Sequence, residues 1–264
     1  MMLCIADGYC TDDSAILSRI AHNFKTWSCG NPKGIGEHTY KVLLIGDYEK
    51  EPIEVSKLIW EISGRKTAGN GGVMRTSIVG LFPKDVEEWA ANICRLTHYD
   101  PRCVGSCVIV SNMIHSLVYD DTAPSFQQIL DWGKKYDDRI KDYIELARQD
   151  NLNVLELQDS NSMGYTLKTL AVGLWAYWHA SSFEEGMLSV VNAGGDADTN
   201  AAVACAILGA KFGFQEIPKE YVRDLAHKNR LEDVIESLLS LQGVPYLKKM
   251  GIIDKLFYWL DWKR

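Results

Sequence analysis

The chain has 264 residues, of which 47% are hydrophobic and 24% are charged. A chain of this length buries most of its unfolded surface on folding, so it needs neither disulfides nor a metal to form a core. The composition is typical of globular proteins and excludes a mainly disordered or fibrous chain. With 28 Lys and Arg against 35 Asp and Glu, the net charge is −7. This balance argues against a nucleic-acid partner, because nucleic-acid-binding surfaces usually carry a basic excess.

The sequence carries no sign of secretion or membrane insertion. The seven cysteines are odd in number and no two have Cys-x-x-Cys spacing, which favours free thiols in a reducing compartment over a disulfide framework or a thiolate zinc site. The N-terminal residues have no basic region and no long apolar run, unlike a signal peptide. The most apolar stretch, residues 165–180, contains Lys168 and is shorter than the ~20 residues of a membrane span. We therefore expect a cytoplasmic protein without a membrane partner.

Apolar residues recur at helical spacing along most of the chain. In chain order, this spacing predicts helices over residues 86–96, 102–118, 167–178, 201–210 and 231–239. Pro101 stands where one of these helices begins, and proline is tolerated in a first turn. Residues 41–45 are the only short strand candidate, and the Gly-, Pro- and Asn-rich residues 28–36 are typical of a surface loop. The sequence therefore predicts an all-α fold in a single domain, residues 1–264.

Acidic and hydroxyl residues lie side by side at two predicted helix starts. The first is Thr11-Asp12-Asp13-Ser14, and the second is Gly194-Gly195-Asp196-Ala197-Asp198-Thr199-Asn200. Helix capping is one explanation, because such side chains accept hydrogen bonds from free backbone N–H groups and acids suit the helix dipole. At the second start, two glycines allow a tight turn, and the apolar residues 201–210 behind it should be buried. Carboxylates at the mouth of a buried helix are costly unless paired or coordinated, which favours a functional role there.

The two acidic corners would form a metal site if they met in space. Their four carboxylates would repel one another strongly at pH 7, and two divalent cations would balance the charge. Oxygen ligands of this kind suit Mg²⁺ or Mn²⁺. Asp196, Asp198 and Asn200 have the spacing of the first ligands in a calcium loop. However, Ala201 and Ile207 stand where that loop has Gly and Glu, so an EF-hand is excluded.

Two further segments could contact a ligand. Residues 69–75, Gly-Asn-Gly-Gly-Val-Met-Arg, form a glycine-rich turn that runs into a helix. The N–H groups at such a helix start can hold a phosphate, but the Lys-Ser/Thr ending of a P-loop is missing, and a plain turn is the alternative. Residues 97–101, Thr-His-Tyr-Asp-Pro, end one predicted helix and start the next. His98 is either a ligand-binding group there or a helix C-cap.

Taken in this order, the motifs resemble those of the ADP-ribosylglycohydrolase family. The matching pieces are Thr11-Asp12-Asp13-Ser14, residues 69–75, residues 97–101, Gly164-Tyr165 before an apolar helix, and Gly194-Gly195-Asp196-Ala197-Asp198-Thr199. They are spread from residue 11 to about residue 213, a span of roughly three quarters of the chain, and the Gly-Gly-Asp-x-Asp-Thr piece is the most specific. The resemblance implies an all-α, compact orthogonal helix bundle with a two-metal cleft.

The resemblance also implies roles for individual residues. The metal ligands would be Thr11, Asp12, Asp13, Asp196, Asp198 and Thr199, which would bind two Mg²⁺ ions, or Mn²⁺ in their place. The four aspartates would be catalytic. Asn70, Gly71 and Gly72 would line the ADP-ribose site, with His98 near the phosphates and Tyr165 near the ligand. The implied reaction is metal-dependent hydrolysis of the glycosidic bond between ADP-ribose and a protein side chain, so the partner would be an ADP-ribosylated protein or a small ADP-ribosyl substrate.

One departure from the family pattern bears on turnover more than on fold. Only ten residues precede Thr11, whereas family members usually carry a longer N-terminal helix with a Gly-Asp motif and a Glu. Two alternatives to an efficient ADP-ribosyl hydrolase stay open, and the first of them follows from this departure. One is a family member that binds ADP-ribose or has a structural role, with little or no turnover. The other is a metal-dependent hydrolase that acts on a different ribosyl or phosphoryl substrate.

Overall fold

The computed structural model describes residues 1–10, 15–120 and 122–241. Over these residues the chain is built from helices, with one isolated antiparallel bridge between Gly69 and Tyr165 and no strand. The longer helices are α1 (Met2–Tyr9), α2 (Ile16–Cys29), α3 (Glu37–Leu44), α4 (Pro52–Ile62), α6 (Val86–Arg95), α7 (Pro101–Tyr119), α8 (Phe126–Lys134), α9 (Arg139–Leu146), α10 (Thr166–His179), α11 (Phe183–Asn192), α12 (Ala197–Phe212) and α14 (Lys228–Ser240). The shorter pieces are α5 (Val73–Thr76), α13 (Lys219–Arg223) and the 3₁₀ segments η1 (Ser77–Leu81), η2 (Leu152–Leu155) and η3 (Phe214–Glu216). The predicted all-α fold is confirmed.

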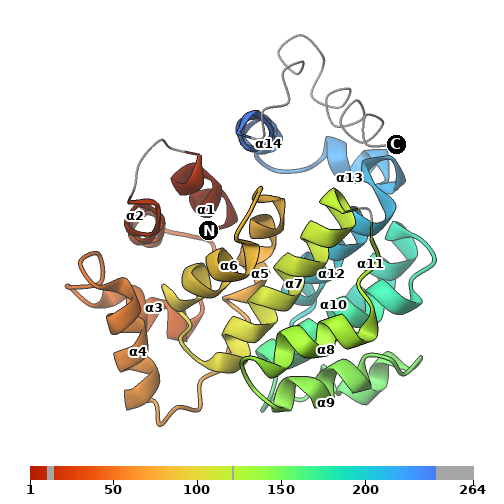
Figure 1. Ribbon diagram of the computed structural model, residues 1–264, viewed down its shortest axis with the longest axis horizontal. Coiled ribbons are helices and arrows are strands. Elements are labelled where there is room, and N and C mark those ends of the chain that lie inside the picture. The colour runs from red at the N-terminus through yellow and green to blue at the C-terminus, as the bar shows by residue number, and fades with distance from the viewer. Residues whose placement is uncertain (11–14, 121, 242–264) are drawn as a thin grey trace.

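Helix α7 runs through the middle of the molecule, with α6 on one side and α10 and α12 on the other (Figure 1). The helix begins at Pro101, after Asp100, whose carboxylate accepts a hydrogen bond from the backbone N–H of Arg102 at 3.0 Å. Every residue from 102 to 111 is buried, because apolar and small side chains occur on all sides of this part of the helix. The core is therefore organised around α7.

Helices α10 and α12 pack closely against each other. A Cβ atom on Gly173 of α10 would lie 3.0 Å from Cδ1 of Ile207 and 3.1 Å from Cγ1 of Val203, both on α12. The first turns of the two helices are joined by a hydrogen bond of 2.8 Å from the Thr169 hydroxyl to Oδ1 of Asn200. This packing places the N-terminal end of α12, which carries the second acidic corner, beside the start of α10.

The predicted helices agree with the structure, and the strand candidate does not. The five predicted helices correspond to α6, α7, α10, α12 and α14. Of the predicted loop over residues 28–36, residues 30–36 lie between α2 and α3, and the first two residues belong to α2. The strand candidate at residues 41–45 is wrong, because most of it belongs to α3. Thr39, Val42 and Leu43 are buried together, at helical spacing. The period of so short an apolar run does not distinguish a strand from a helix.

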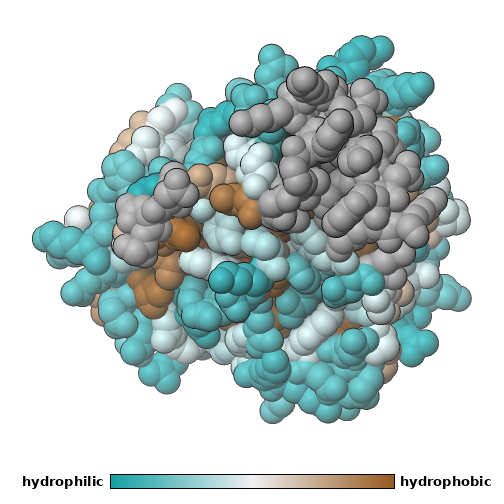
Figure 2. All heavy atoms as spheres, turned by 45° about the horizontal axis from the view of Figure 1, so that its top comes forward, coloured by the Kyte–Doolittle hydropathy of each residue, from teal (hydrophilic) through white to brown (hydrophobic). Residues whose placement is uncertain are grey.

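The described surface has ordinary polarity. No helix in this part of the chain is long and apolar enough to cross a membrane. The face shown in Figure 2 is mainly hydrophilic, with small hydrophobic patches. Large apolar side chains such as Leu44 and Ile62 are exposed on separate helices, as is common on protein surfaces.

Candidate functional site

The second acidic corner is a tight turn that leads into α12. Gly194 and Gly195 have φ values of +76° and +69°, a left-handed conformation that favours glycine. A Cβ atom on Gly195 would also collide with the carbonyl oxygen of Leu157. The predicted turn is thus confirmed, and it places Asp196 at the N-cap of α12. Helix capping does not explain this carboxylate, because the Asp196 side chain makes no capping hydrogen bond.

The Asp196 carboxylate is bonded to the glycine-rich turn instead. Its Oδ2 accepts a hydrogen bond of 2.7 Å from Nδ2 of Asn70. The same Nδ2 donates to the Thr169 hydroxyl at 3.0 Å, and that hydroxyl donates to Oδ1 of Asn200 at 2.8 Å. Asn70, Thr169 and Asn200 are buried, whereas Asp196 is half-buried. The structure therefore joins the two motifs through a chain of buried polar side chains that ends at a partly accessible carboxylate.

The Gly164 turn lies against the same two side chains. The backbone N–H of Asn70 donates to the carbonyl of Gly164, and that of Thr166 donates to the carbonyl of Ala68, both at 2.9 Å. Gly164 has a φ of +80°. A Cβ atom there would lie 3.5 Å from Oδ2 of Asp196 and 3.7 Å from Oδ1 of Asn70. Glycine therefore suits this position on two grounds, the backbone conformation and the close approach of the polar pair.

The Tyr165 ring is held by a buried ion pair and by a second tyrosine. The guanidinium of Arg102 lies 5.5 Å from the ring centroid and donates a hydrogen bond of 3.4 Å to the Tyr165 hydroxyl. Arg102 also donates to both carboxylate oxygens of Asp100 at 2.7 Å, and the Trp60 indole donates to this carboxylate at 2.9 Å. The hydrogen bonds to Asp100 raise the pKa of Arg102. Tyr143 packs edge-on against Tyr165 with 5.6 Å between ring centroids.

His98 lies behind the glycine-rich turn and is closed off from solvent. It is 2% exposed, and its Nδ1 is 2.8 Å from the hydroxyl oxygen of Thr97. Arg75 donates to the same hydroxyl at 2.6 Å and to the carbonyl of Gly71 at 2.7 Å. Burial, the charge of Arg75 and the neighbouring His38 lower the pKa of His98 well below its ordinary value. The ring is therefore neutral at pH 7, and it bonds a side chain instead of capping the helix before it.

The two glycines after Asn70 allow close packing behind the turn. A Cβ atom on Gly71 would lie 3.1 Å from the His98 ring, and one on Gly72 would lie 3.2 and 3.4 Å from the sulfurs of Cys94 and Cys107. Gly72 has a φ of −73°, which any residue adopts, and the helix after it, α5, has only four residues. The roles of Asn70, Gly71 and Gly72 in binding ADP-ribose stay predictions.

The predicted metal site falls partly outside the described residues. Thr11, Asp12 and Asp13 belong to the segment 11–14, of which nothing is described. Within the described ranges no group of three or more His, Cys, Asp or Glu side chains could hold a metal ion. On α12, Asp198 is exposed, and its Oδ1 accepts a hydrogen bond of 2.9 Å from the backbone N–H of Thr199. Asp196, Asp198 and Thr199 offer only oxygen donors, which fit Mg²⁺ or Mn²⁺, but a complete site requires further ligands.

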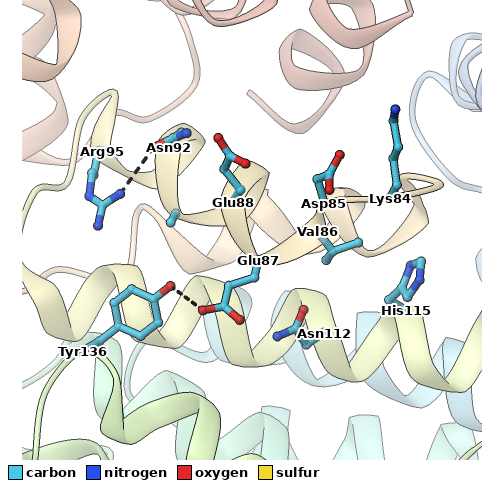
Figure 3. A pocket seen from close by; sticks show the side chains of 11 residues that line it. Lys84, Asp85, Val86, Glu87, Glu88, Asn92, Arg95, Asn112, His115 and Tyr136 are labelled. Atoms are coloured by element: carbon cyan, nitrogen blue, oxygen red, sulfur yellow. Dashed lines mark hydrogen bonds between the residues drawn. The ribbon is translucent and has the colours of Figure 1, made fainter.

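A solvent-open cavity of about 550 Å³ lies elsewhere, between α6 and α7 (Figure 3). None of the residues that the sequence analysis singles out as site residues lines it. The Glu87 carboxylate in this cavity accepts hydrogen bonds from the Tyr136 hydroxyl at 3.2 Å and from Lys135 at 2.8 Å. Because this charge is already paired and the walls are open, the chemistry of the molecule is better placed at Asp196 than in this cavity.

Three residues of the site were not predicted to be functional. Thr169 interrupts the apolar residues 165–180, and a polar side chain in a buried helix needs a partner, which is the signal that could have found it. Asn200 follows the acidic corner directly, and Arg102 follows residues 97–101. The partners of Thr169 and Asn200 lie far away in the sequence, so their pairing follows only from the fold.

The chain is similar to proteins of one known family. Residues 1–247 match the family model for ADP-ribosylglycohydrolase. The ADP-ribosyl-[dinitrogen reductase] glycohydrolase of Rhodospirillum rubrum is 27% identical over 183 residues, which cover 67% of this chain and 58% of that protein. The ADP-ribosylarginine hydrolase Tri1 of Pseudomonas putida is 23% identical over 259 residues, which cover 91% of this chain and 64% of that protein. This chain thus spans less than two thirds of the length of either relative.

A solved structure described as an ADP-ribosylglycohydrolase-related protein complex has the same fold. It superposes with a TM-score of 0.66 at 22% identity, over 91% of this chain and 79% of that chain. In the present structure, the glycine-rich turn, the Gly164-Tyr165 segment and the Asp196 corner meet at one place. Given the match over residues 1–247, the chain belongs to the ADP-ribosylglycohydrolase family.

Proposed function

We propose that this chain is a metal-dependent hydrolase that cleaves the glycosidic bond between ADP-ribose and a protein side chain. The observation that carries the proposal is the hydrogen bond of 2.7 Å between Asn70 and Asp196, which joins the glycine-rich turn to the acidic corner beside the Gly164 turn. The names of the two relatives, a glycohydrolase and an ADP-ribosylarginine hydrolase, support the same reaction class. The same two names favour an ADP-ribosylated protein as substrate, with arginine as the attachment site to test first.

The residues around this corner have different proposed roles in binding ADP-ribose. Tyr165 is half-buried, so its ring can stack or hydrogen-bond with the nucleoside part. Asn70 uses its Nδ2 within the protein, which leaves its Oδ1 for a ligand group. His98 is closed off and neutral, so we assign it to shaping residues 69–72 and not to direct contact with a phosphate.

The chemistry depends on oxygen donors at the mouth of α12. The predicted ligands of the cations are Thr11, Asp12, Asp13, Asp196, Asp198 and Thr199. When bound, Mg²⁺ supplies electrostatic stabilisation and lowers the pKa of a coordinated water. The water oxygen bonds to C1 of the distal ribose while the bond from C1 to the side-chain nitrogen or oxygen breaks. Asp198, which is exposed, takes the water proton and returns it to the leaving nitrogen or oxygen as that bond breaks, and the neighbouring carboxylates stabilise the oxocarbenium-like transition state.

The test is release of labelled ADP-ribose from arginine-linked and serine-linked proteins. The enzyme is first stripped with a chelator and is then assayed with and without Mg²⁺ or Mn²⁺. We expect release that requires the added cation, and a higher melting temperature in its presence, because a ligand that binds only the folded state stabilises it. Release from neither substrate, together with micromolar binding of ADP-ribose (about −8 kcal/mol), would replace hydrolysis by the alternative of a binding protein. If ADP-ribose does not bind either, a different ribosyl or phosphoryl substrate becomes the leading alternative.

A further inference from the structure

We propose that Thr169 and Asn200 are positioning residues that fix the Asn70 side-chain amide and, through it, the Asp196 carboxylate. This inference rests on the proposed function only for its effect on the reaction. The structural part concerns four side chains and three hydrogen bonds: Asn70 to Asp196 at 2.7 Å, Asn70 to Thr169 at 3.0 Å, and Thr169 to Asn200 at 2.8 Å.

The direction of each hydrogen bond follows from the donors and acceptors available. Oδ1 of Asn200 can only accept, so the hydroxyl of Thr169 must donate to it. This hydroxyl therefore presents a lone pair to Asn70, and Asn70 must turn its NH₂ group toward Thr169. The second N–H of that group then points to Oδ2 of Asp196. A carboxylate is also acceptor-only, so both ends of the chain require the same orientation of the amide.

Burial distinguishes positioning from direct catalysis. Thr169 is 1% exposed and Asn200 is 3% exposed, so neither side chain is able to touch a substrate bound at the surface of the corner. Asp196, by contrast, is half-buried. A charge-assisted hydrogen bond from Asn70 holds one of its oxygens. The network therefore leaves Oδ1 of Asp196 and Oδ1 of Asn70 for other partners, with no side chain on Gly164 between the two residues.

Loss of the Thr169 hydroxyl should slow the reaction, because this hydroxyl helps to hold the Asn70 amide that bonds Asp196. Removing a hydrogen-bond partner of a ligating group typically lowers metal affinity or activity by roughly 10–100-fold. Without the Thr169 hydroxyl, the Asn70 amide loses one of its two fixed contacts and can rotate away from Asp196. We expect kcat to fall by more than KM rises, because the ADP-ribose contacts of Tyr165 do not involve this network, whereas the contact proposed for Asn70 does.

The kinetic test compares three substitutions on α10 in the full chain. Thr169→Val removes the hydroxyl at nearly constant volume, and we expect it to lower kcat roughly 10–100-fold. Thr169→Ser keeps the hydroxyl and should restore most of the rate. Thr166→Val is the matched control, because Thr166 is also buried on α10 but its hydroxyl takes no part in the hydrogen bonds that hold Asn70. If Thr169→Val and Thr166→Val have the same kcat, the inference is overturned.

A second measurement is independent of activity. The side-chain NH₂ resonances of Asn70, assigned in ¹H–¹⁵N spectra by their loss in Asn70→Ser, should be well separated and slow to exchange with water in the wild type. Thr169→Val should make the exchange at least severalfold faster, and Thr166→Val should leave it unchanged. Equal exchange in both valine variants overturns the inference. A wild type that shows slow exchange but no hydrolysis refutes the proposed function and leaves the positioning of Asn70 supported.

Discussion

Two buried arginines support the candidate site, and their surroundings differ. Arg102, beside the Tyr165 ring, donates to both oxygens of the buried Asp100 carboxylate. Arg75, behind the glycine-rich turn, donates to the carbonyl of Gly71 and to a hydroxyl, and its guanidinium lies 4.7 Å from the Phe24 ring centroid. The Nε atom of Arg75 is buried and has no hydrogen-bond partner in the described part of the chain. No carboxylate of the described residues forms an ion pair with Arg75.

The comparison shows two uses of a buried positive charge. The pKa of Arg102 is raised, because the hydrogen bonds of Asp100 outweigh burial, whereas the pKa of Arg75 is lowered by burial. Arg102 therefore ties Tyr165 to the start of α7 through a paired charge. Arg75, which has no carboxylate partner among the described residues, contributes a positive charge that helps to keep His98 neutral. The first arrangement fixes geometry, and the second makes this part of the core sensitive to acid.

The largest effect on stability should come from breaking the paired arginine. Arg102→Met leaves the Asp100 carboxylate buried, which should lower the free energy of unfolding by about 3–5 kcal/mol. The control is Arg223→Met, which removes a 2.6 Å ion pair to Asp224 between two exposed side chains and should cost much less, because exposed ion pairs contribute little to stability. Urea unfolding of both variants measures the difference. Equal losses would contradict the view that the buried pair carries the structural role.

Acid should destabilise the Arg75 side of the site through His98. Its folded-state pKa lies below the unfolded value of 6.5, so only the unfolded state binds a proton as the pH falls below about 6.5. The contribution of neutral His98 to the free energy of unfolding is therefore fully present above this pH and is lost progressively as the pH falls below it. The loss reaches about 2 kcal/mol at pH 5 if His98 stays neutral there.

The variant His98→Gln measures this contribution. It should flatten the decrease in unfolding free energy between pH 7 and pH 5. His38, whose pKa burial also lowers, accounts for part of the remaining slope. An unaltered pH profile in His98→Gln would show that His98 does not carry the acid sensitivity.

The smallest effect is expected for the unpaired arginine. Arg75→Met removes a charge without leaving an unpaired carboxylate among the described residues. The loss of its hydrogen bonds is offset, because the variant no longer transfers a charged guanidinium from water into the core on folding. We expect a change in unfolding free energy within about 1 kcal/mol, well below that of Arg102→Met. The pKa of His98 should also rise without this neighbouring charge, so the acid-induced loss should become smaller. A loss as large as that of Arg102→Met would contradict the view that the two buried arginines differ in their pairing.

Much of the fold follows from sequence, because its helices are long and strongly periodic. The 3.6-residue pattern located α7 and α10 to within a few residues, and an almost continuous run of small apolar residues located α12. Residues 41–45 were mistaken for a strand because four or five apolar residues contain too little of either period. The glycines at 194 and 195 were interpreted correctly, since their turn conformation is a local property of the backbone.

The site residues that could be predicted from the sequence are those that belong to a recognisable motif. Asp196 and Asn70 were both singled out, but nothing in either motif shows that they are bonded to each other. Thr169 was hidden inside an apolar helix, and its partner Asn200 lies 31 residues further along the chain. His98 was expected near phosphates, whereas its burial follows from packing between segments that are distant in sequence.

The most direct test of the central claim, that the Asp196 corner is the site of ADP-ribosyl hydrolysis, is single-turnover release of ADP-ribose by Asp196→Asn. The asparagine keeps the size of the side chain and an oxygen that can accept from Asn70, but it removes the charge. We predict that release from the substrate cleaved by the wild type slows by at least roughly 100-fold, while Asp131→Asn, on the exposed side of α8, keeps the wild-type rate. A rate for Asp196→Asn within about threefold of wild type (less than 1 kcal/mol) would contradict the account.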